Sequence, residues 1–418
     1  MKIKQSFFSI VVLLLIGFGS LATKSDWGFF GHRRINRMAV FTLPPDMMPV
    51  YKTNIDFLTD HAVDPDKRRY ATKHEAVRHY IDIDHWGTPP YDNVPRDWTE
   101  MLMKFTDVYI SRKPGDTLQI MGDNIVDFGE RDLVLKSPRV LKRANENPTV
   151  SKREYQQFFR DNILPLYYED DWVLDCDAVT EFFAKTGLKY NCASAFAKDR
   201  FSEYGILPYH LISMQRRLTK AFEDQDVKKI LRTSAEFGHY IGDAHVPLHT
   251  TENYNGQMTN QVGIHGFWES RIPEIFADEY YDYFVGKATY ISDPKEYYWD
   301  IVLTSHSYLD SVLLIEKELS QTFPEDKQYC YEERLQRTIR TYCKDYAAAY
   351  SRRMDGMVED RMQASILSIG SAWFTAWVDA GQPDLRKMTG FELTEAERKQ
   401  QKEEELLFQR GEIKGREH

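Results

Sequence analysis

The stretch Gly238–Thr250, with the sequence GHYIGDAHVPLHT, contains four residues of types that commonly bind metal ions, and His245, two residues after Asp243, points elsewhere, which leaves three candidate ligands. His239 and Asp243 are four residues apart, which is about one helical turn, so both point from the same face of a helix. Pro247 ends that helix and separates His249 from its register. The pattern therefore predicts a helix that carries two ligands and a following turn that carries a third.

A second stretch follows at His265–Glu269, with the sequence HGFWE. His265 and Glu269 repeat the spacing of four residues. Gly238 and Gly242 flank the first pair and allow another segment of backbone to approach closely. Imidazole and carboxylate ligands without a thiolate are typical of a hydrolytic zinc site, so the two stretches together indicate metal-assisted hydrolysis.

The composition is that of an ordinary globular protein, with 418 residues, 42% hydrophobic, 28% charged and 14% aromatic. No linker rich in proline, glycine or serine divides the chain, which favours one large domain with a long insertion. The formal net charge of −10 argues against non-specific binding to duplex nucleic acid, because that binding depends on lysine and arginine.

The first residues predict a signal peptide over 1–22. Lys2 and Lys4 precede an apolar run from Phe7 to Phe18, and Ala22 is a suitable residue for cleavage. We therefore expect an exported, periplasmic or extracellular protein without a stable membrane span, because the apolar run is short for a transmembrane helix. Removal of both lysines would make the net charge −12.

The four cysteines are compatible with disulfides in an exported protein. Cys176 and Cys192 could close a loop. Cys330 and Cys343 lie in a segment expected to be helical, where thirteen residues span about 20 Å. We expect that the second two cannot pair with each other unless that helix breaks.

Hydrophobic periodicity predicts an all-α fold. The expected domain covers residues 23–390, with an insertion over 86–200 that contains irregular loops and helix toward Tyr155–Phe183, and a charged, solvated tail over 391–418. A break of the last helix is expected near Gly356 or Gly370. The other segments with helical periodicity are Ile35–Phe41, Met47–His61, Leu207–Phe222, Val227–Val246, Tyr297–Leu319 and Tyr331–Val378.

Three further stretches precede the insertion. They are WGFFGH at Trp27–His32, DKRRY at Asp66–Tyr70 and HYID at His79–Asp82. With the two later motifs, they resemble the superfamily that joins zinc-dependent phospholipase C with secreted single-strand-specific nucleases, which also act as 3′-nucleotidases. The matching motifs cover roughly residues 27–82 and 205–270, while residues 86–200 and the tail have no counterpart.

This resemblance implies a compact, mostly helical domain with three zinc ions at the base of a cleft. One ion would be held by Asp66, His79, His239 and Asp243. A second would be held by His249, His265 and Glu269. A third would be held by His32 and the backbone amine and carbonyl of Trp27, with Asp243 as a bridge.

Two points in this assignment stay open. Asp64 is the alternative to Asp66, because it has the family's distance from His79, whereas Asp66 places Arg69 and Tyr70 where the nucleases carry Arg-Tyr. In the resembled enzymes the tryptophan is the mature N-terminus. Cleavage after Ala22 would leave four residues before Trp27, and an amide nitrogen does not bind zinc as a free amine does.

The resemblance also implies the chemistry. A water shared by two zinc ions would attack a phosphodiester, with Asp66, Arg69 and Asp243 as the catalytic group. Arg69 would hold a phosphate oxygen, and Tyr80 and Asp82 would bind a base by stacking and hydrogen bonding.

The first expectation is a single-strand nuclease or 3′-nucleotidase, whose partner is single-stranded nucleic acid or a nucleotide. A zinc-dependent phospholipase C, which acts on a phospholipid head group, is the alternative, because Glu269 is its variant of the ligand. A third reading, from another class, is a non-catalytic zinc-binding exported protein. The sequence indicates no protein partner.

Overall fold

The computed structural model describes residues 28–113, 115–136, 148–185, 188–334, 337–388 and 394–410. The expected signal peptide at 1–22, Trp27, and residues 391–393 and 411–418 of the expected tail lie outside this part of the chain.

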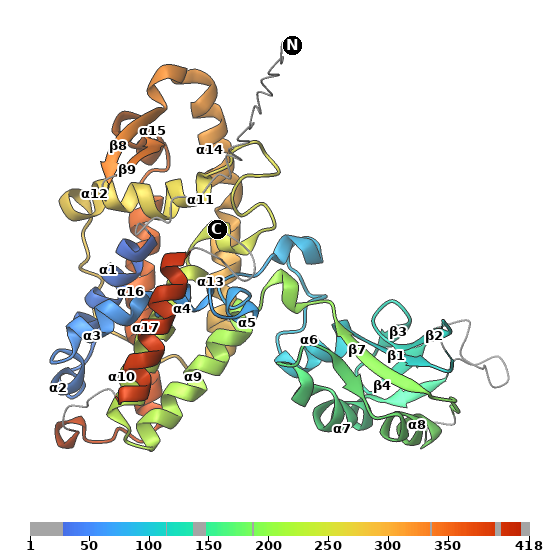
Figure 1. Cartoon of the computed structure of the whole chain (residues 1–418). Helices are drawn as coiled ribbons and strands as arrows, with labels where there is room; N and C mark the ends of the chain where they lie inside the picture. Colours follow the sequence, from blue (N-terminus) through green and yellow to red (C-terminus); the bar gives the residue numbers. More distant parts are fainter. Residues whose placement is uncertain are drawn as a thin grey trace, which may run out of the picture.

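The body of the molecule is helical, and among its four central helices the third and fourth in chain order each contact the other three (Figure 1). Asn36 on the first of these helices donates to the carbonyl of Ala235 at 2.9 Å, and the Trp373 indole donates to the carbonyl of Ser234 at 3.0 Å. These buried hydrogen bonds fix the register between neighbouring helices. The four helices are α1 (Gly28–Ala39), α9 (Leu207–Glu223), α10 (Val227–Ala244) and α16 (Met357–Asp379).

Further helices complete the body around these four (Figure 1). They are η1 (Val40–Thr42), α2 (Met48–Tyr51), α3 (Ile55–Asp60), η2 (His61–Val63), α4 (Asp64–Arg68), α5 (Lys73–Ala76), η3 (Ile83–Trp86), η6 (Pro247–Thr250), α13 (Pro294–Ser307), α14 (Leu309–Thr322) and η9 (Leu385–Lys387).

Local signals explain where the ligand-bearing helix begins. Asp226 caps α10 by accepting from the backbone N–H of Lys229 at 3.1 Å, which satisfies a donor that the first turn leaves free. Gln225 adopts a left-handed φ of 54° in the short turn after α9. At the other end of the chain, α16 starts directly after Gly356, which has a φ of 82°, so the expected break falls there and Gly370 lies inside the helix.

The prediction of an all-α fold is wrong. Helices make up 59% of the structure, but the described residues also form nine strands in three antiparallel sheets, so the fold is mixed α/β. Seven of these strands belong to a lobe that projects to one side of the helical body (Figure 1), and they lie in the region expected to contain only loops and helix.

One sheet of this lobe has the order β2-β1-β7-β6, and another has the order β3-β4-β5. The expected disulfide Cys176–Cys192 ties the first residue of a lobe helix to the segment before the last strand. The elements are α6 (Trp98–Phe105), β1 (Thr106–Ser111), β2 (Thr117–Met121), β3 (Val126–Phe128), β4 (Asp132–Leu135), β5 (Thr149–Ser151), α7 (Lys152–Asn162), η4 (Leu164–Leu166), β6 (Trp172–Leu174), α8 (Cys176–Lys185), β7 (Ser194–Asp199) and η5 (Ser202–Tyr204).

The lobe leaves and rejoins the helical body at neighbouring points. Trp86 from the outgoing segment stacks on Phe201 from the returning one, with ring centroids 4.7 Å apart. The backbone N–H of Arg200 also donates to the carbonyl of Phe105 at 3.1 Å. The insertion therefore attaches through a short aromatic neck.

A smaller core packs beside the second ligand pair, and it corrects the expectation for Cys330 and Cys343. The segment expected to be helical from Tyr331 instead forms a hairpin of β8 (Tyr329–Arg334) and β9 (Arg337–Tyr342), and the two cysteines form a disulfide. Tyr, Thr and Ile are frequent in these two segments and favour strands, which explains why the helix gives way here. The core also includes residues of α14 and of α11 (Ile264–Gly266), η7 (Phe267–Arg271), α12 (Ile272–Tyr280) and α15 (Lys344–Arg353), and the short η8 (Glu325–Lys327) precedes the hairpin.

The described part of the expected tail is the helix α17 (Glu395–Arg410), which lies against α4 (Figure 1). Lys67 pairs with Glu405 at 2.9 Å, and Glu404 is buried. The tail is thus packed on the body rather than fully solvated. Among the described helices, none combines the length and hydrophobicity required to cross a membrane.

Candidate metal centre

Close packing of α1 on α10 brings ligand types from two helices together. A Cβ at Gly238 would overlap the Asn36 side-chain oxygen, and one at Gly242 would lie 2.6 Å from Ile35 Cδ1 and 3.1 Å from His32 Nδ1. These distances are shorter than normal packing allows. The two glycines therefore permit the approach that places His32 beside α10.

The first group of ligand-type atoms comes from α4, the segment after α5, and α10. His79 Nδ1 lies 3.0 Å from Asp243 Oδ2, 3.1 Å from His239 Nε2 and 3.8 Å from Asp66 Oδ1. His239 Nε2 lies 3.7 Å from Asp66 Oδ1 and 3.3 Å from Asp243 Oδ2. The four atoms converge on one point.

The second group lies beyond the end of α10. His249 follows Pro247 in the turn η6, and its Nε2 lies 3.4 Å from Glu269 Oε2. His265 Nε2 lies 2.7 Å from the same carboxylate oxygen. Glu269 sits in η7, which is a π-helical turn. Single π-turns inside helices are often found at functional sites.

Asp243 lies between the groups. Its Oδ2 faces His79 and His239, whereas its Oδ1 lies 3.3 Å from His32 Nε2 and 3.9 Å from His249 Nε2. His32 Nε2 is also 3.4 Å from Glu269 Oε1. Three groups of described residues could thus hold a metal ion: His32, His239 and Asp243; Asp66, His79 and His239; and His249, His265 and Glu269.

Backbone carbonyls orient several of the imidazoles. Nδ1 of His239 lies 2.8 Å from the carbonyl of Ala62, Nδ1 of His249 lies 2.6 Å from the carbonyl of His79, and Nδ1 of His265 lies 3.1 Å from the carbonyl of Tyr254. An Nδ1–H that donates to a carbonyl leaves the Nε2 lone pair directed toward the group, as a metal ligand requires.

The electrostatics fit bound cations. Burial, followed by neighbouring positive groups such as His239, holds the pKa of His79 well below its usual value. Burial likewise lowers the pKa of His249 to about 4, so both are neutral ligands at physiological pH. Burial raises the pKa of Asp243, and Asp66 and Glu269 raise it further, because three carboxylates share a buried space. Divalent cations would relieve that repulsion, and the donor set suits them.

Asp66, and not Asp64, lies in the first group. Asp64 Oδ2 is 2.5 Å from His61 Nδ1, and this pair lies outside the three groups. Arg69 is buried, and its Nη1 lies 3.6 Å from Asp66 Oδ1. The structure therefore brings a guanidinium to the edge of the ligand cluster.

Tyr80 and Asp82 lie outside the ligand groups. Only 3% of Tyr80 is exposed, and its hydroxyl donates to the carbonyl of Glu203 at 3.0 Å. A ring with so little exposed surface offers no platform on which a base could stack. Asp82 is also buried, and both residues line a hollow of about 430 Å³.

Glu75 is a residue that the sequence interpretation missed. It is buried, its Oε1 lies 3.9 Å from His79 Nε2, and it accepts a hydrogen bond from Arg78 at 2.8 Å and from the Tyr240 hydroxyl. It stands four residues before His79, the same spacing that marks the other pairs, so the signal was present. A carboxylate behind a ligating histidine orients the ring and raises its basicity.

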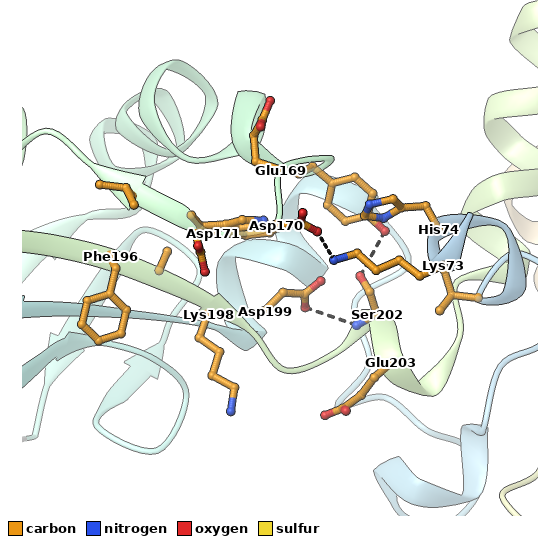
Figure 2. Close-up of a pocket in the computed structure, with 15 residues that line it drawn as sticks. Lys73, His74, Glu169, Asp170, Asp171, Phe196, Lys198, Asp199, Ser202 and Glu203 are labelled. Atoms are coloured by element: carbon orange, nitrogen blue, oxygen red, sulfur yellow. Dashed lines mark hydrogen bonds and ion pairs between the residues drawn. The ribbon is translucent and has the colours of Figure 1, made fainter. Parts of the chain in front are cut away.

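A separate pocket lies between the lobe and the body (Figure 2). We call it the interlobe pocket; its volume is about 540 Å³, and its lining includes no residue of the three ligand groups. Lys73 extends from α5 toward Asp170 on the lobe side (Figure 2). The interlobe pocket and the hollow beside Tyr80 have three lining residues in common, Lys73, Val77 and Glu203. Its charged lining residues are Lys73, Lys198, Glu169, Asp170, Asp171, Asp199 and Glu203.

The structure thus brings together eight of the nine predicted metal-binding residues, while Trp27 lies outside the described part of the chain. No family model and no curated protein sequence matches this chain.

Proposed function

We propose that the chain is an exported zinc-dependent phosphoesterase that cleaves short single-stranded nucleic acids or 3′-nucleotides. The observation that carries this proposal is the position of the Asp243 carboxylate, whose two oxygens face different ligand groups. A carboxylate in this position could bind two cations at once. Sites with neighbouring metal ions are typical of phosphodiester hydrolysis.

Nitrogen and oxygen donors without thiolates favour zinc in a catalytic rather than a structural role. When bound, zinc would lower the pKa of a coordinated water toward neutrality and would stabilise negative charge on the phosphate. The residues that would hold it are Asp66, His79, His239 and Asp243; His249, His265 and Glu269; and His32, together with Trp27.

Arg69 would contact the substrate in this proposal and would not bind zinc. Its guanidinium is held at the edge of the cluster by burial and by Asp66. A phosphate near the cluster could accept two parallel hydrogen bonds from it. Arg69 would thereby orient a non-bridging phosphate oxygen.

The interlobe pocket supports short substrates. Its lining has five carboxylates and two lysines, so it would repel a long polyanion that extended from the centre across the lobe. A nucleotide or a short strand avoids this repulsion. Two disulfides are consistent with the export that the proposal includes.

A phospholipase C remains the second candidate, because the carboxylate of the second group is Glu269, the variant that those enzymes share. A non-catalytic zinc-binding protein is the third. The large number of carboxylates disfavours it, since such sites usually leave a position for water.

The test uses the chain from residue 23 onward, loaded with zinc. Hydrolysis of single-stranded DNA, a 3′-nucleotide and phosphatidylcholine micelles would be measured with and without a chelator, beside Asp243→Ala. We expect chelator-sensitive cleavage of the first two substrates that the variant lacks. Cleavage of the lipid alone would establish the phospholipase, and no turnover despite bound zinc would contradict both enzymes.

A further inference from the structure

A second pocket, of about 530 Å³, is lined by residues of α4, α9 and α10 and by Arg78. We call it the basic pocket. Although the whole chain has a net charge of −10, this lining has six cationic side chains and only two carboxylates, Asp224 and Glu236. The cations are Arg68, Arg78, Arg217, Lys220, Lys229 and Arg232.

The floor of the basic pocket is rigid. Arg68 donates to Glu236 at 2.9 Å and to the Tyr240 hydroxyl at 3.4 Å, and its Nε lies 3.4 Å from Glu75. Arg78 donates to Glu75 at 2.8 Å. A guanidinium has five N–H donors, so these pairs hold both side chains in place and leave donors for a ligand.

The rim of the pocket is more open. Arg217 donates to the sulfur of Met214 at 3.5 Å, and among the described residues no carboxylate lies within ion-pair distance of it. Lys220 and Lys229 are exposed and pair with Asp224 and Asp226, near the ends of their own helices. These three cations can reorient toward an anion at little cost, because exposed ion pairs contribute little free energy.

A second observation points independently to a ligand. His210 lines the basic pocket and is buried, with 8% of its surface exposed. Within the described part of the chain, its Nε2 is buried and has no hydrogen-bond partner. A buried polar atom without a partner costs about 1–3 kcal/mol, so such atoms usually meet a ligand or water.

We propose that the basic pocket binds a phosphate-bearing anion at a position separate from the metal centre. The guanidinium groups of the floor match tetrahedral oxyanions in geometry, and the rim cations supply charge. A buried imidazole nitrogen supplies one further hydrogen bond. The volume lies within the range of sites for small organic ligands.

The site also touches the frame of the metal centre. Arg68, Arg78 and Tyr240 are close in sequence to Asp66, His79 and His239, and all three contact Glu75. The basic pocket nevertheless contains no metal-type ligand of the three groups. Its occupation does not depend on the proposed hydrolysis.

Inorganic phosphate, titrated calorimetrically into the zinc-loaded chain, tests the proposal. The main variant is Arg217→Gln/Lys220→Gln/Lys229→Gln, which leaves every buried ion pair of the floor intact. Its control is Lys295→Gln/Lys317→Gln/Lys327→Gln, which removes the same charge from exposed positions elsewhere. Asp243→Asn identifies binding at the metal centre, and His210→Phe tests the imidazole.

We expect two classes of phosphate binding in the unmodified chain. The main variant and His210→Phe should each weaken one class about tenfold, the effect of losing charge-assisted hydrogen bonds. The control should stay within about twofold, and Asp243→Asn should remove the other class. Unchanged binding in the main variant, or a single class that Asp243→Asn abolishes, would overturn the proposal. If the unmodified chain shows only the class that the main variant weakens, and no class that depends on Asp243, the result would count against the phosphoesterase and support the basic pocket.

Discussion

The helical body and the inserted lobe differ in how their sequences determine their structures. In the body, His239 and Asp243 lie on one helix, and His265 and Glu269 lie across one helical turn, so spacing alone places each pair. In the lobe, β1 pairs with β7, more than eighty residues away, and no local sequence pattern predicts which strand β1 pairs with. Local spacing therefore predicts each ligand pair, whereas the pairing of β1 with β7 depends on contact between distant segments.

The two regions also differ in the interactions that stabilise them. Glycines, buried amides and the ligand cluster join the helices of the body. The lobe has short strands, a disulfide and an aromatic neck. Separate stabilisation means that each region can be perturbed while the other serves as the reference.

The largest effect should come from Asp243→Ala. Because both of its oxygens face ligand groups, its loss should remove zinc from more than one position and lower phosphoester hydrolysis about 1,000-fold. Elemental analysis and initial rates would measure this. Asp300→Ala, an exposed aspartate on α13, should bind the full amount of zinc. Full zinc content in Asp243→Ala would refute the shared role.

Replacement of Cys176 and Cys192 by serine should affect the lobe alone. The disulfide closes a loop with a sequence separation of 16, so its loss should cost about 3 kcal/mol. Hydrogen exchange should show faster opening of β1 and β7 with unchanged zinc content. Zinc loss in this variant would show that the two regions are not independent.

Gly238→Ala should destabilise the body by about 2 kcal/mol, because the added methyl group would overlap the Asn36 side chain. Chemical denaturation of the zinc-loaded protein would measure the change. Gly266→Ala is the matched control, since no atom lies within 4 Å of its added Cβ. Equal stability of both variants would contradict the close contact of α1 and α10.

Glu75→Gln should weaken zinc binding about tenfold, because the carboxylate lies behind His79 and supports its basicity. Competition with a chromophoric chelator would give the affinity. Glu325→Gln, on η8 and exposed, provides the comparison. If Glu75 only fills space, affinity would not change.

The smallest effect concerns pH. Burial, with Arg78 and Arg217 in addition, holds the pKa of His210 well below its usual value. An unfolded histidine protonates near pH 6.5, so the stability that a neutral His210 permits is present above that pH and is lost as the pH falls below it. The slope should be at most about 1.4 kcal/mol per pH unit. His210→Phe should flatten the profile by this amount, and an unchanged slope would contradict it.

Helix-period spacing and the position of Pro247 are local signals, and they were sufficient to select His239, Asp243, His249, His265 and Glu269. His32, Asp66 and His79 lie in separate segments, and only the resemblance pointed to them. The sequence was insufficient for Tyr80, since the hydroxyl contact with Glu203 depends on how the returning segment of the lobe packs. Glu75 stands at the same spacing of four residues from His79, but its partners come from three separate segments, so its place behind this ring is evident only in the folded structure.

The strands escaped detection for physical reasons. In β7, Ala195 and Ala197 form the buried face, and alanine gives little hydrophobic contrast with the exposed positions. Other strands contain only three residues, too few to show an alternating pattern. The hairpin of Cys330 and Cys343 was read as helix because its charged residues fit either structure.

The ligand cluster has a consequence for the order of assembly. His79 and His239 are separated by 160 residues, and the whole lobe lies between them. An ion that binds both would close that loop as a cross-link does, with a cost that grows with the length of free chain. A lobe that folds first, bringing Trp86 onto Phe201, would shorten that free chain to 7 residues on one side and 38 on the other. The lobe contributes no residue to the three ligand groups, but its folding would then help to bring the ligand-bearing segments together.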